Sequence, residues 1–280
     1  MTDVPPPSPG SPPVPPLRDG APPLAILVDY DGTVSLTDVT EQILAQHVAG
    51  VWEEAEASYD AGRMGSRRLM TWEVSLIDAD PDEMRRTAAA QPHDPGFVPF
   101  VRRAQAASIP VEVVSDGYGF FIEPALESLG VGELPVVTAR TVFSGRQATI
   151  EFPNGHPTCL VCGTCKRHRV LAYRAAGRRV VYIGDGESDR YAAGYSDVVF
   201  AKRSLERICL EADWPYHRWT AFSEIDRWLA ETLETWRGDV SSLTAVPAGA
   251  PPPRGFFCGP EVWGEGLVDP PPGSWPPPAT

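Results

Sequence analysis

Two acidic residues, Asp29 and Asp31, come directly after a short apolar run that is typical of a buried strand. The run is Leu24–Val28, and the next residues read Asp-Tyr-Asp-Gly-Thr. Ligands of an open α/β sheet bind beyond the carboxyl ends of its strands, so both carboxylates are expected to face a crevice. Because two close carboxylates repel each other unless they share a cation or a proton, the pair predicts a metal site or a proton-transfer site. A polar turn after a strand is the other interpretation.

A second strand-like run, Val111–Val114, apolar except for Glu112, ends in a small hydroxyl and a glycine turn. Ser115 and Gly117 follow it. Such a turn can offer a hydroxyl and backbone amides to an anion. We therefore expect Ser115 and Gly117 to contribute to a phosphate site.

A third apolar run, Val180–Ile183, is followed by two more acidic residues, Asp185 and Asp189. Carboxylate oxygens from two strand ends are ligands that Mg²⁺ prefers, and the ion keeps positions for water and a phosphate. The sequence therefore predicts a Mg²⁺ site that includes Asp185 and Asp189 together with Asp29 and Asp31.

Lys166 opens a stretch with helical character, and Arg167 and Arg169 stand close behind it. A cation at the positive end of a helix dipole costs about 0.3–1 kcal/mol, and a bound anion reverses that sign. Lys166 is therefore predicted to bind phosphate. On this argument alanine at position 166 would leave the stability of the ligand-free protein unchanged or slightly raised. A solvated basic patch remains the alternative for the two arginines.

Strands and helices alternate between these motifs, which is typical of a doubly wound parallel α/β sheet. The expected strands are Leu24–Val28, Val111–Val114, Val136–Ala139, Val180–Ile183 and Val198–Ala201. The expected helices include Val39–Ala61, Arg67–Leu76, Pro99–Ala107, Phe120–Leu129, Lys166–Ala176 and Glu224–Trp236. A hairpin is expected over Thr141–Phe152.

The domain organisation follows from where this alternation stops. Residues 34–98 contain helical patterns without a convincing strand, which indicates a helical cap inserted after the first strand. Residues 23–33 and 99–237 form the expected catalytic core. Proline-rich segments at residues 1–22 and 238–280 are expected to be disordered tails without a core of their own, and their partner is unknown.

Composition excludes several classes of function. The net charge is −13, which argues against a protein that neutralises nucleic acid or an anionic membrane. No apolar run near the start is long enough for a membrane span. Five cysteines, three of them clustered, do not suggest a disulfide framework. A cytoplasmic protein is the expectation.

The clustered cysteines form an evenly spaced row with a histidine. His156, Cys159, Cys162 and Cys165 recur at every third position just before Lys166. Such a row could form a Cys₃His zinc site, although structural zinc sites usually use two separated pairs of ligands. The alternatives are that Cys159 and Cys162 are reduced thiols in a loop or form a redox-labile pair.

Four motifs, each at a strand end or helix start, resemble those of the haloacid dehalogenase superfamily of phosphatases. In chain order they are Asp29-x-Asp31-Gly-Thr, Ser115 after a strand, Lys166, and Gly-Asp185-Gly-x-x-Asp189. The insertion after the first motif resembles the phosphoserine-phosphatase-like branch. The match spans about residues 24–230 and leaves both proline-rich segments unexplained.

A narrower resemblance is to the methionine-salvage phosphatases, which act on 2-hydroxy-3-keto-5-methylthiopentenyl-1-phosphate. Cys162-Gly-Thr-Cys165-Lys166 and the segment Phe200–Leu205 carry it. The second motif reads Ser115-Asp116-Gly117, where that family is expected to have Ser-Gly-Gly. The additional carboxylate lies beside the phosphate motif and bears on the substrate.

The resemblance implies a mechanism. Asp29 would be the nucleophile that forms an aspartyl-phosphate, and Asp31 the general acid and base. Mg²⁺ would be held by Asp29, the main-chain carbonyl of Asp31, and Asp185, while Ser115 and Lys166 hold the phosphoryl oxygens. Asp189 would orient Lys166 or a metal-bound water.

The expected function is thus a Mg²⁺-dependent phosphatase of a small phosphorylated metabolite, with the methylthio-ketose phosphate as one substrate. Phosphoserine and phosphocholine-like compounds stay open as substrates. A phosphomutase of the same superfamily would use the same pair of aspartates. A binding scaffold with proline-rich tails is the non-enzymatic alternative.

Overall fold

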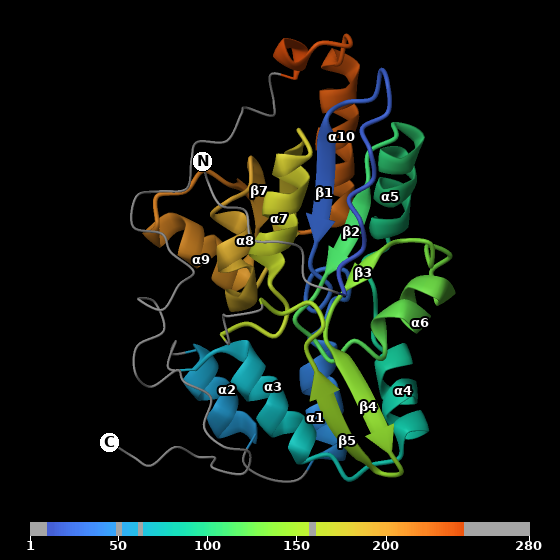
Figure 1. The fold of residues 1–280 in the computed structure, drawn as a ribbon, viewed down its shortest axis with the longest axis vertical. Coiled ribbons are helices and arrows are strands. Elements are labelled where there is room, and N and C mark those ends of the chain that lie inside the picture. Colours follow the sequence, from blue (N-terminus) through green and yellow to red (C-terminus); the bar gives the residue numbers. More distant parts are fainter. Residues whose placement is uncertain (1–9, 49–51, 61–63, 157–160, 244–280) are drawn as a thin grey trace.

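A six-stranded parallel sheet forms the centre of the molecule (Figure 1). The computed structural model describes residues 10–48, 52–60, 64–156 and 161–243. In sheet order the strands are β3 (Val136–Val137), β2 (Val111–Val114), β1 (Leu24–Val28), β6 (Arg179–Gly184), β7 (Val198–Ala201) and β8 (His217–Arg218). All five neighbouring pairs run parallel, which confirms the predicted doubly wound α/β fold.

Two apolar layers sandwich the sheet because alternate residues of each strand point to opposite faces. Leu24, Ile26 and Val28 pack into the larger cluster of buried residues, together with Phe97 and Phe222. The intervening Ala25 and Leu27 pack into a second cluster with Val170, Tyr173 and Leu205. Burial on both faces explains why β1 and β7 are apolar at every position.

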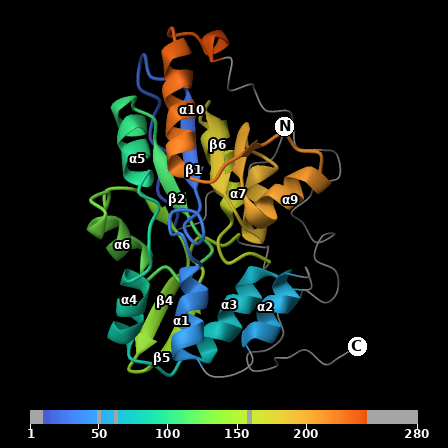
Figure 2. The same cartoon turned by 180° about the vertical axis from the view of Figure 1, so that it is seen from behind.

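Helices cover both faces of the sheet, as Figures 1 and 2 show from opposite sides. The helices of the sheet layers are α5 (Phe97–Ala106), α6 (Ile122–Ser128), α7 (Lys166–Ala175), α8 (Arg190–Ala193), α9 (Arg203–Glu211) and α10 (Phe222–Thr235). The larger cluster of buried residues includes side chains of α5, α6 and α10, and the second includes side chains of α7, α8 and α9. Short 3₁₀ turns occur at Glu187–Asp189 and Val240–Ser242.

Four helices form a separate group beyond the carboxyl end of β1 (Figure 1). They are α1 (Val39–His47), α2 (Trp52–Asp60), α3 (Ser66–Ser75) and α4 (Pro81–Ala89). The single helix expected over Val39–Ala61 was wrong: Val48 has φ −119° and ψ 122°, an extended conformation that ends α1. The boundaries of the cap stay a prediction.

The expected hairpin is confirmed as β4 (Arg140–Ser144) and β5 (Gln147–Glu151), which pair antiparallel. It lies beside the four inserted helices and packs against α3, although it belongs to the segment assigned to the core (Figure 1). An Asp78–Gln147 bridge and an ion pair between Arg146 and Asp78 attach its turn to the loop before α4. The space beyond the sheet is therefore enclosed by two segments: the inserted helices, which precede β2 in the chain, and the hairpin, which follows it.

Part of the first proline-rich segment has a defined place. Arg178 donates hydrogen bonds to the carbonyl oxygens of Pro15 and Pro16, at 3.2 and 2.9 Å, and to that of Leu24 at 3.0 Å. The indole nitrogen of Trp236 donates to the carbonyl of Gly20 at 3.0 Å. Residues 10–22 thus contact the core, whereas residues 1–9 and 244–280 lie outside the described residues.

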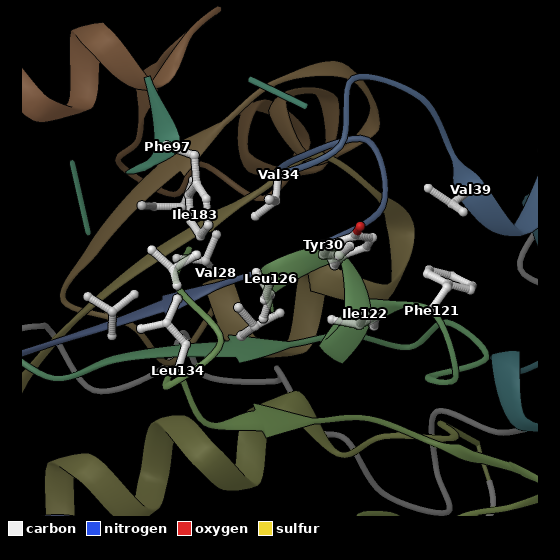
Figure 3. Close-up of a cluster of buried hydrophobic side chains, with 14 of the residues drawn as sticks. Val28, Tyr30, Val34, Val39, Phe97, Phe121, Ile122, Leu126, Leu134 and Ile183 are labelled. Atoms are coloured by element: carbon white, nitrogen blue, oxygen red, sulfur yellow. The ribbon is translucent and has the colours of Figure 1, made fainter. Parts of the chain in front are cut away.

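Tyr30 anchors the loop after β1 in the larger apolar cluster (Figure 3). Its ring lies 5.8 Å from that of Phe121, and its hydroxyl is 2.9 Å from His93 Nε2. Because neighbouring residues of extended chain point to opposite sides, this anchor turns Asp29 and Asp31 away from the apolar cluster. Within the described part of the chain, no helix is long and apolar enough to cross a membrane.

Candidate active site

Asp29 and Asp185 lie at the point where the order of the strands reverses. From β1 the chain first builds the sheet through β2 and β3, then returns to the other side of β1 with β6. Val28 pairs with Ile183, so Asp29 and Asp185 come just beyond the ends of adjacent strands. A crevice of this kind is where open α/β sheets bind their ligands.

Lys166 lies at the centre of the charged residues. Its Nζ donates to Asp29 Oδ1 at 2.7 Å, to Asp189 Oδ1 at 2.7 Å and to Ser188 Oγ at 2.9 Å. The lysine is 2% exposed, and both carboxylates are buried. The first residue of α7 is thus bound to carboxylates from two strand ends, and all three of its N–H donors have acceptors.

The charges explain the direction of the pKa shifts. Burial alone would lower the pKa of Lys166, but the carboxylates of Asp189, Asp29 and Asp116 outweigh it and raise that pKa. Burial also raises the pKa of Asp29 well above 3.8, and the carboxylates of Asp189 and Asp185 raise it further, although the charge of Lys166 and its hydrogen bond lower it. One lysine therefore does not compensate the negative charge collected here, which favours an additional cation.

Asp29, Asp185 and Asp189 form a candidate metal centre. Each offers an oxygen within 4.8 Å of the others, and this is the one such group of His, Cys, Asp and Glu found among the described residues. Burial and the Asp189 carboxylate raise the pKa of Asp185 to about 6. Hard carboxylate oxygens with incompletely balanced charge fit Mg²⁺.

Asp189 differs from the other two carboxylates because donors surround it. Its Oδ1 accepts from Lys166 and from the Tyr182 hydroxyl, and its Oδ2 accepts from the backbone N–H groups of Asp185 and Gly186, both at 2.9 Å. The side chain is fully buried. This arrangement holds Lys166 and the loop after β6 in place.

Asp31 lies two residues beyond Asp29 in the loop after β1. Its Oδ1 accepts a hydrogen bond from the backbone N–H of Val39 at 3.0 Å, which joins the loop after β1 to the start of α1. Burial, and then the carboxylates of Asp38 and Asp29, raise its pKa well above 3.8. A raised pKa suits a carboxyl group that gives and takes a proton near neutral pH.

Gly117 packs closely against both Asp31 and Ser115. The Gly117 N–H donates to Ser115 Oγ at 3.0 Å. A Cβ at position 117 would lie 2.5 Å from Asp31 Oδ2 and 3.2 Å from Ser115 Oγ, which explains the glycine. The second motif and the first therefore meet, as the sequence predicted.

A cavity of about 530 Å³ lies between the strand ends and the inserted helices, and its lining includes Asp29, Asp31, Ser115, Gly117 and Asp185. Among the described residues of its lining, nine carry carboxylates and one, Arg203, is cationic. Arg203 donates to Asp185 Oδ2 at 2.9 Å. Without a bound cation, the lining of the cavity therefore has a large excess of acidic over basic side chains.

The predicted zinc row is not assembled by the part of the chain that the structure describes. Cys162 and Cys165 form no disulfide with another described cysteine, and neither they nor His156 belong to a metal-ligand group found among the described residues. Cys159 lies outside those residues, so the zinc site stays a prediction.

Several residues at the site were not predicted. Arg203 stands in a segment on which the resemblance to the methionine-salvage phosphatases rests. Its bond to Asp185 and its left-handed backbone, with φ 49°, could not be predicted from the sequence. Ser188 lies between the two predicted aspartates. Glu73, in the middle of α3, gave no signal because its acidic neighbours are distant in sequence.

The fold and the site define an α/β enzyme whose acidic and basic side chains meet beyond the ends of parallel strands. The chain belongs to the haloacid dehalogenase-like hydrolase family, whose model matches residues 26–194. The predicted resemblance is confirmed, and the chain is a hydrolase of phosphoric monoesters.

Similar proteins include two 2-hydroxy-3-keto-5-methylthiopentenyl-1-phosphate phosphatases. The one from Geobacillus thermodenitrificans is 30% identical over 211 residues, covering 72% of this chain and 93% of that protein. The one from Brevibacillus brevis is 26% identical over 218 residues, covering 75% of this chain and 97% of that protein.

Similar solved structures are phosphoserine phosphatases. A phospho-aspartyl intermediate analogue of phosphoserine phosphatase has a TM-score of 0.58 and 19% identity, covering 74% of this chain and 99% of that chain. Phosphoserine phosphatase from T. onnurineus has a TM-score of 0.57 and 14% identity, covering 76% and 96%. At these identities the likeness establishes the fold.

Proposed function

We propose that this protein is a Mg²⁺-dependent phosphatase of a small phosphorylated metabolite and forms an aspartyl-phosphate on Asp29. The observation that carries the proposal is the convergence of Asp29, Asp31, Ser115 and Asp185 on one cavity, with Lys166 bonded to Asp29. Nothing in a structural role requires a buried lysine, several carboxylates and a glycine turn to meet at strand ends.

In the first step an oxygen of Asp29 attacks phosphorus, and the bond to the leaving oxygen breaks. Asp31, protonated at the start, gives its proton to that oxygen. In the second step Asp31 takes a proton from water, whose oxygen attacks the phosphorus. Inorganic phosphate leaves and the Asp29 carboxylate is restored.

Ser115, the amide of Gly117 and Lys166 hold the phosphoryl oxygens in this proposal. Asp189 acts as a positioning residue through its bond to Lys166. Mg²⁺ would be held by Asp29, the main-chain carbonyl of Asp31, and Asp185, with Asp189 close by. When bound, it supplies positive charge that offsets repulsion between the carboxylates and the phosphate.

The proposed substrate is a methylthio-ketose phosphate of methionine salvage. Support comes from the two similar phosphatases named above, which act on such a compound. This chain covers 97% and 93% of their lengths. A small-molecule substrate also suits an acidic cavity of this size, which opposes a nucleic acid. We place the activity in the cytoplasm.

Release of inorganic phosphate from a set of phosphorylated metabolites, with and without Mg²⁺, tests the proposal. We expect Mg²⁺-dependent release, fastest from the methylthio-ketose phosphate. Preference for phosphoserine or a phosphocholine-like ester would support the alternative substrates. An isomeric ester that retains its phosphate would identify a phosphomutase, and absence of turnover and of substrate binding would favour a scaffold.

A further inference from the structure

One wall of the cavity carries a buried carboxyl group whose hydrogen bonding is incomplete. Glu73 lies on α3, lines the cavity and is 1% exposed. Its Oε2 accepts a hydrogen bond from the Tyr118 hydroxyl at 3.1 Å. Its Oε1 is buried and accepts no hydrogen bond from an N–H or hydroxyl donor among the described residues. Leaving such an acceptor unpaired costs free energy, so its place in a ligand cavity is notable.

A second polar atom on the same wall has the same property. Thr40 Oγ1, in the first turn of α1, is buried without a partner in the described part of the chain and also lines the cavity. Thr40 lies beside the second motif, because a Cβ at Gly117 would be 3.5 Å from its Oγ1. The two orphaned atoms therefore belong to the cap side of a cavity whose floor holds the phosphate motifs.

The surroundings of Glu73 determine which ligand it accepts. Burial, then the charge of the neighbouring Glu56 carboxyl on α2, and then a hydrogen bond between the two carboxyl groups, raise the pKa of Glu73 well above 4.5. Leu69 and Met70, one turn earlier on α3, add apolar surface to the same wall. A leaving group carrying a carboxylate would meet like charges here, whereas an N–H or O–H donor would satisfy Oε1.

We propose that Glu73, with Thr40, binds the leaving group of the substrate and selects phosphate esters that present an N–H or O–H donor and no carboxylate. This rests on the proposed phosphatase function. It favours hydroxyl-bearing ketose phosphates and amino-alcohol phosphates, and it disfavours phosphoserine. The alternative is that Glu73 and Glu56 share a proton and stabilise the cap without touching substrate.

The experiment compares kcat/KM for four esters in the full-length protein with Mg²⁺. Phenyl phosphate has neither donor nor carboxylate in its leaving group, and its turnover reports the phosphatase function alone. Glycerol 1-phosphate presents hydroxyls and phosphoethanolamine presents an ammonium. Phosphoserine differs from phosphoethanolamine by one carboxylate, which makes a matched pair.

The variants are Glu73→Met, which removes the acceptor at similar volume, Glu73→Gln, which replaces the ionisable carboxyl group with a neutral amide, and Thr40→Val. Glu53→Gln, an exposed glutamate of α2 outside the cavity, is the charge-matched control. We expect Glu73→Met to lower kcat/KM for glycerol 1-phosphate and for phosphoethanolamine about tenfold or more relative to phenyl phosphate. Glu73→Gln should act mainly on phosphoethanolamine, and Thr40→Val should act in the same direction as Glu73→Met.

The wild-type protein should prefer phosphoethanolamine to phosphoserine, and Glu73→Gln should narrow that ratio. A change shared equally by all four esters, or no change, would overturn the assignment of Glu73 and leave the phosphatase function standing. If Glu73→Met does not fold, Glu73→Gln and the matched pair of esters still decide the question. Failure of wild-type protein to release phosphate from any ester would refute the proposed function and with it this inference.

Discussion

The Ser66 hydroxyl donates a hydrogen bond to Asp116, joining the first residue of α3 to the loop after β2. The other oxygen of Asp116 accepts from the backbone N–H of Thr164 at 2.7 Å, two residues before Lys166. One carboxylate thus connects an inserted helix with the segment that presents the lysine. This explains the aspartate in the second motif, where Ser-Gly-Gly was the expected pattern.

Replacing Asp116 should therefore affect both stability and turnover. We expect Asp116→Ala to lower the free energy of unfolding by about 1.5–3 kcal/mol, the usual contribution of hydrogen bonds to a charged group. It should also lower kcat/KM, because Lys166 and α3 lose a common anchor. Denaturant unfolding and phosphate release measure the two effects.

Ser66→Ala supplies the matched comparison, since it removes one of the two donors and leaves Thr164 in place. The double variant should be less destabilised than the sum of the single variants. Strictly additive effects would show that Ser66 and Asp116 do not act as a pair.

Asp29→Asn should reduce turnover to a trace, a loss on the order of a thousandfold or more, because the amide is not a nucleophile. The fold should persist. Burial raises the pKa of Asp29, so a neutral side chain is tolerated there, and Lys166 keeps Asp189 as a partner. Phosphate release and thermal unfolding measure this, with the exposed Asp213→Asn as control. Substantial activity in Asp29→Asn would remove Asp29 from the role of nucleophile.

Lys166→Ala should both destabilise the protein and lower kcat/KM at least about tenfold. The helix-dipole argument had predicted unchanged or higher stability, but it treated Lys166 as exposed. The structure buries it between Asp29 and Asp189, and removal of one partner from a buried ion pair costs about 3–5 kcal/mol. Unfolding without phosphate or metal is the decisive measurement. An unchanged midpoint would contradict the buried ion pairs.

The correction for Lys166 shows what could be predicted from the sequence. Short, largely apolar runs were enough to predict five strands, and parallel strands bring their carboxyl ends to one edge. The meeting of Asp29, Ser115 and Asp185 followed from that rule. Burial of Lys166 depends on how α7 packs beside β1 and β6, which residue types alone do not determine.

Contacts between distant segments could not be predicted from the sequence for the same reason. Proline content predicted an extended chain at the N-terminus, but not that Arg178 binds the carbonyls of Pro15 and Pro16. The hairpin was predicted from its turn, but its packing on α3 was not. In the sequence, Glu73 is an ordinary polar residue of an expected helix. Only the structure shows that it lies near α1, α2 and the second motif.

Mg²⁺ should raise the melting temperature of the wild-type protein, because it binds the folded state and relieves repulsion among three buried carboxylates. Asp185→Asn should abolish most of that rise. The rise should also shrink as the pH falls from about 7.5 to 5.5, since the pKa of Asp185 is raised to about 6 and protons compete with the metal.

The stability of the metal-free protein should change with pH in the opposite direction and fall as the pH rises. A carboxyl whose pKa is higher in the folded state, about 6 against 3.8, contributes stability that is fully present below 3.8 and lost as pH rises through 6. Asp29 and Asp31 have pKa values raised in the same direction. These groups should therefore make the metal-free protein more stable at pH 5.5 than at 7.5. Thermal unfolding with EDTA and with Mg²⁺ at both pH values measures this, and a Mg²⁺ effect independent of pH and of Asp185 would rule out this metal site.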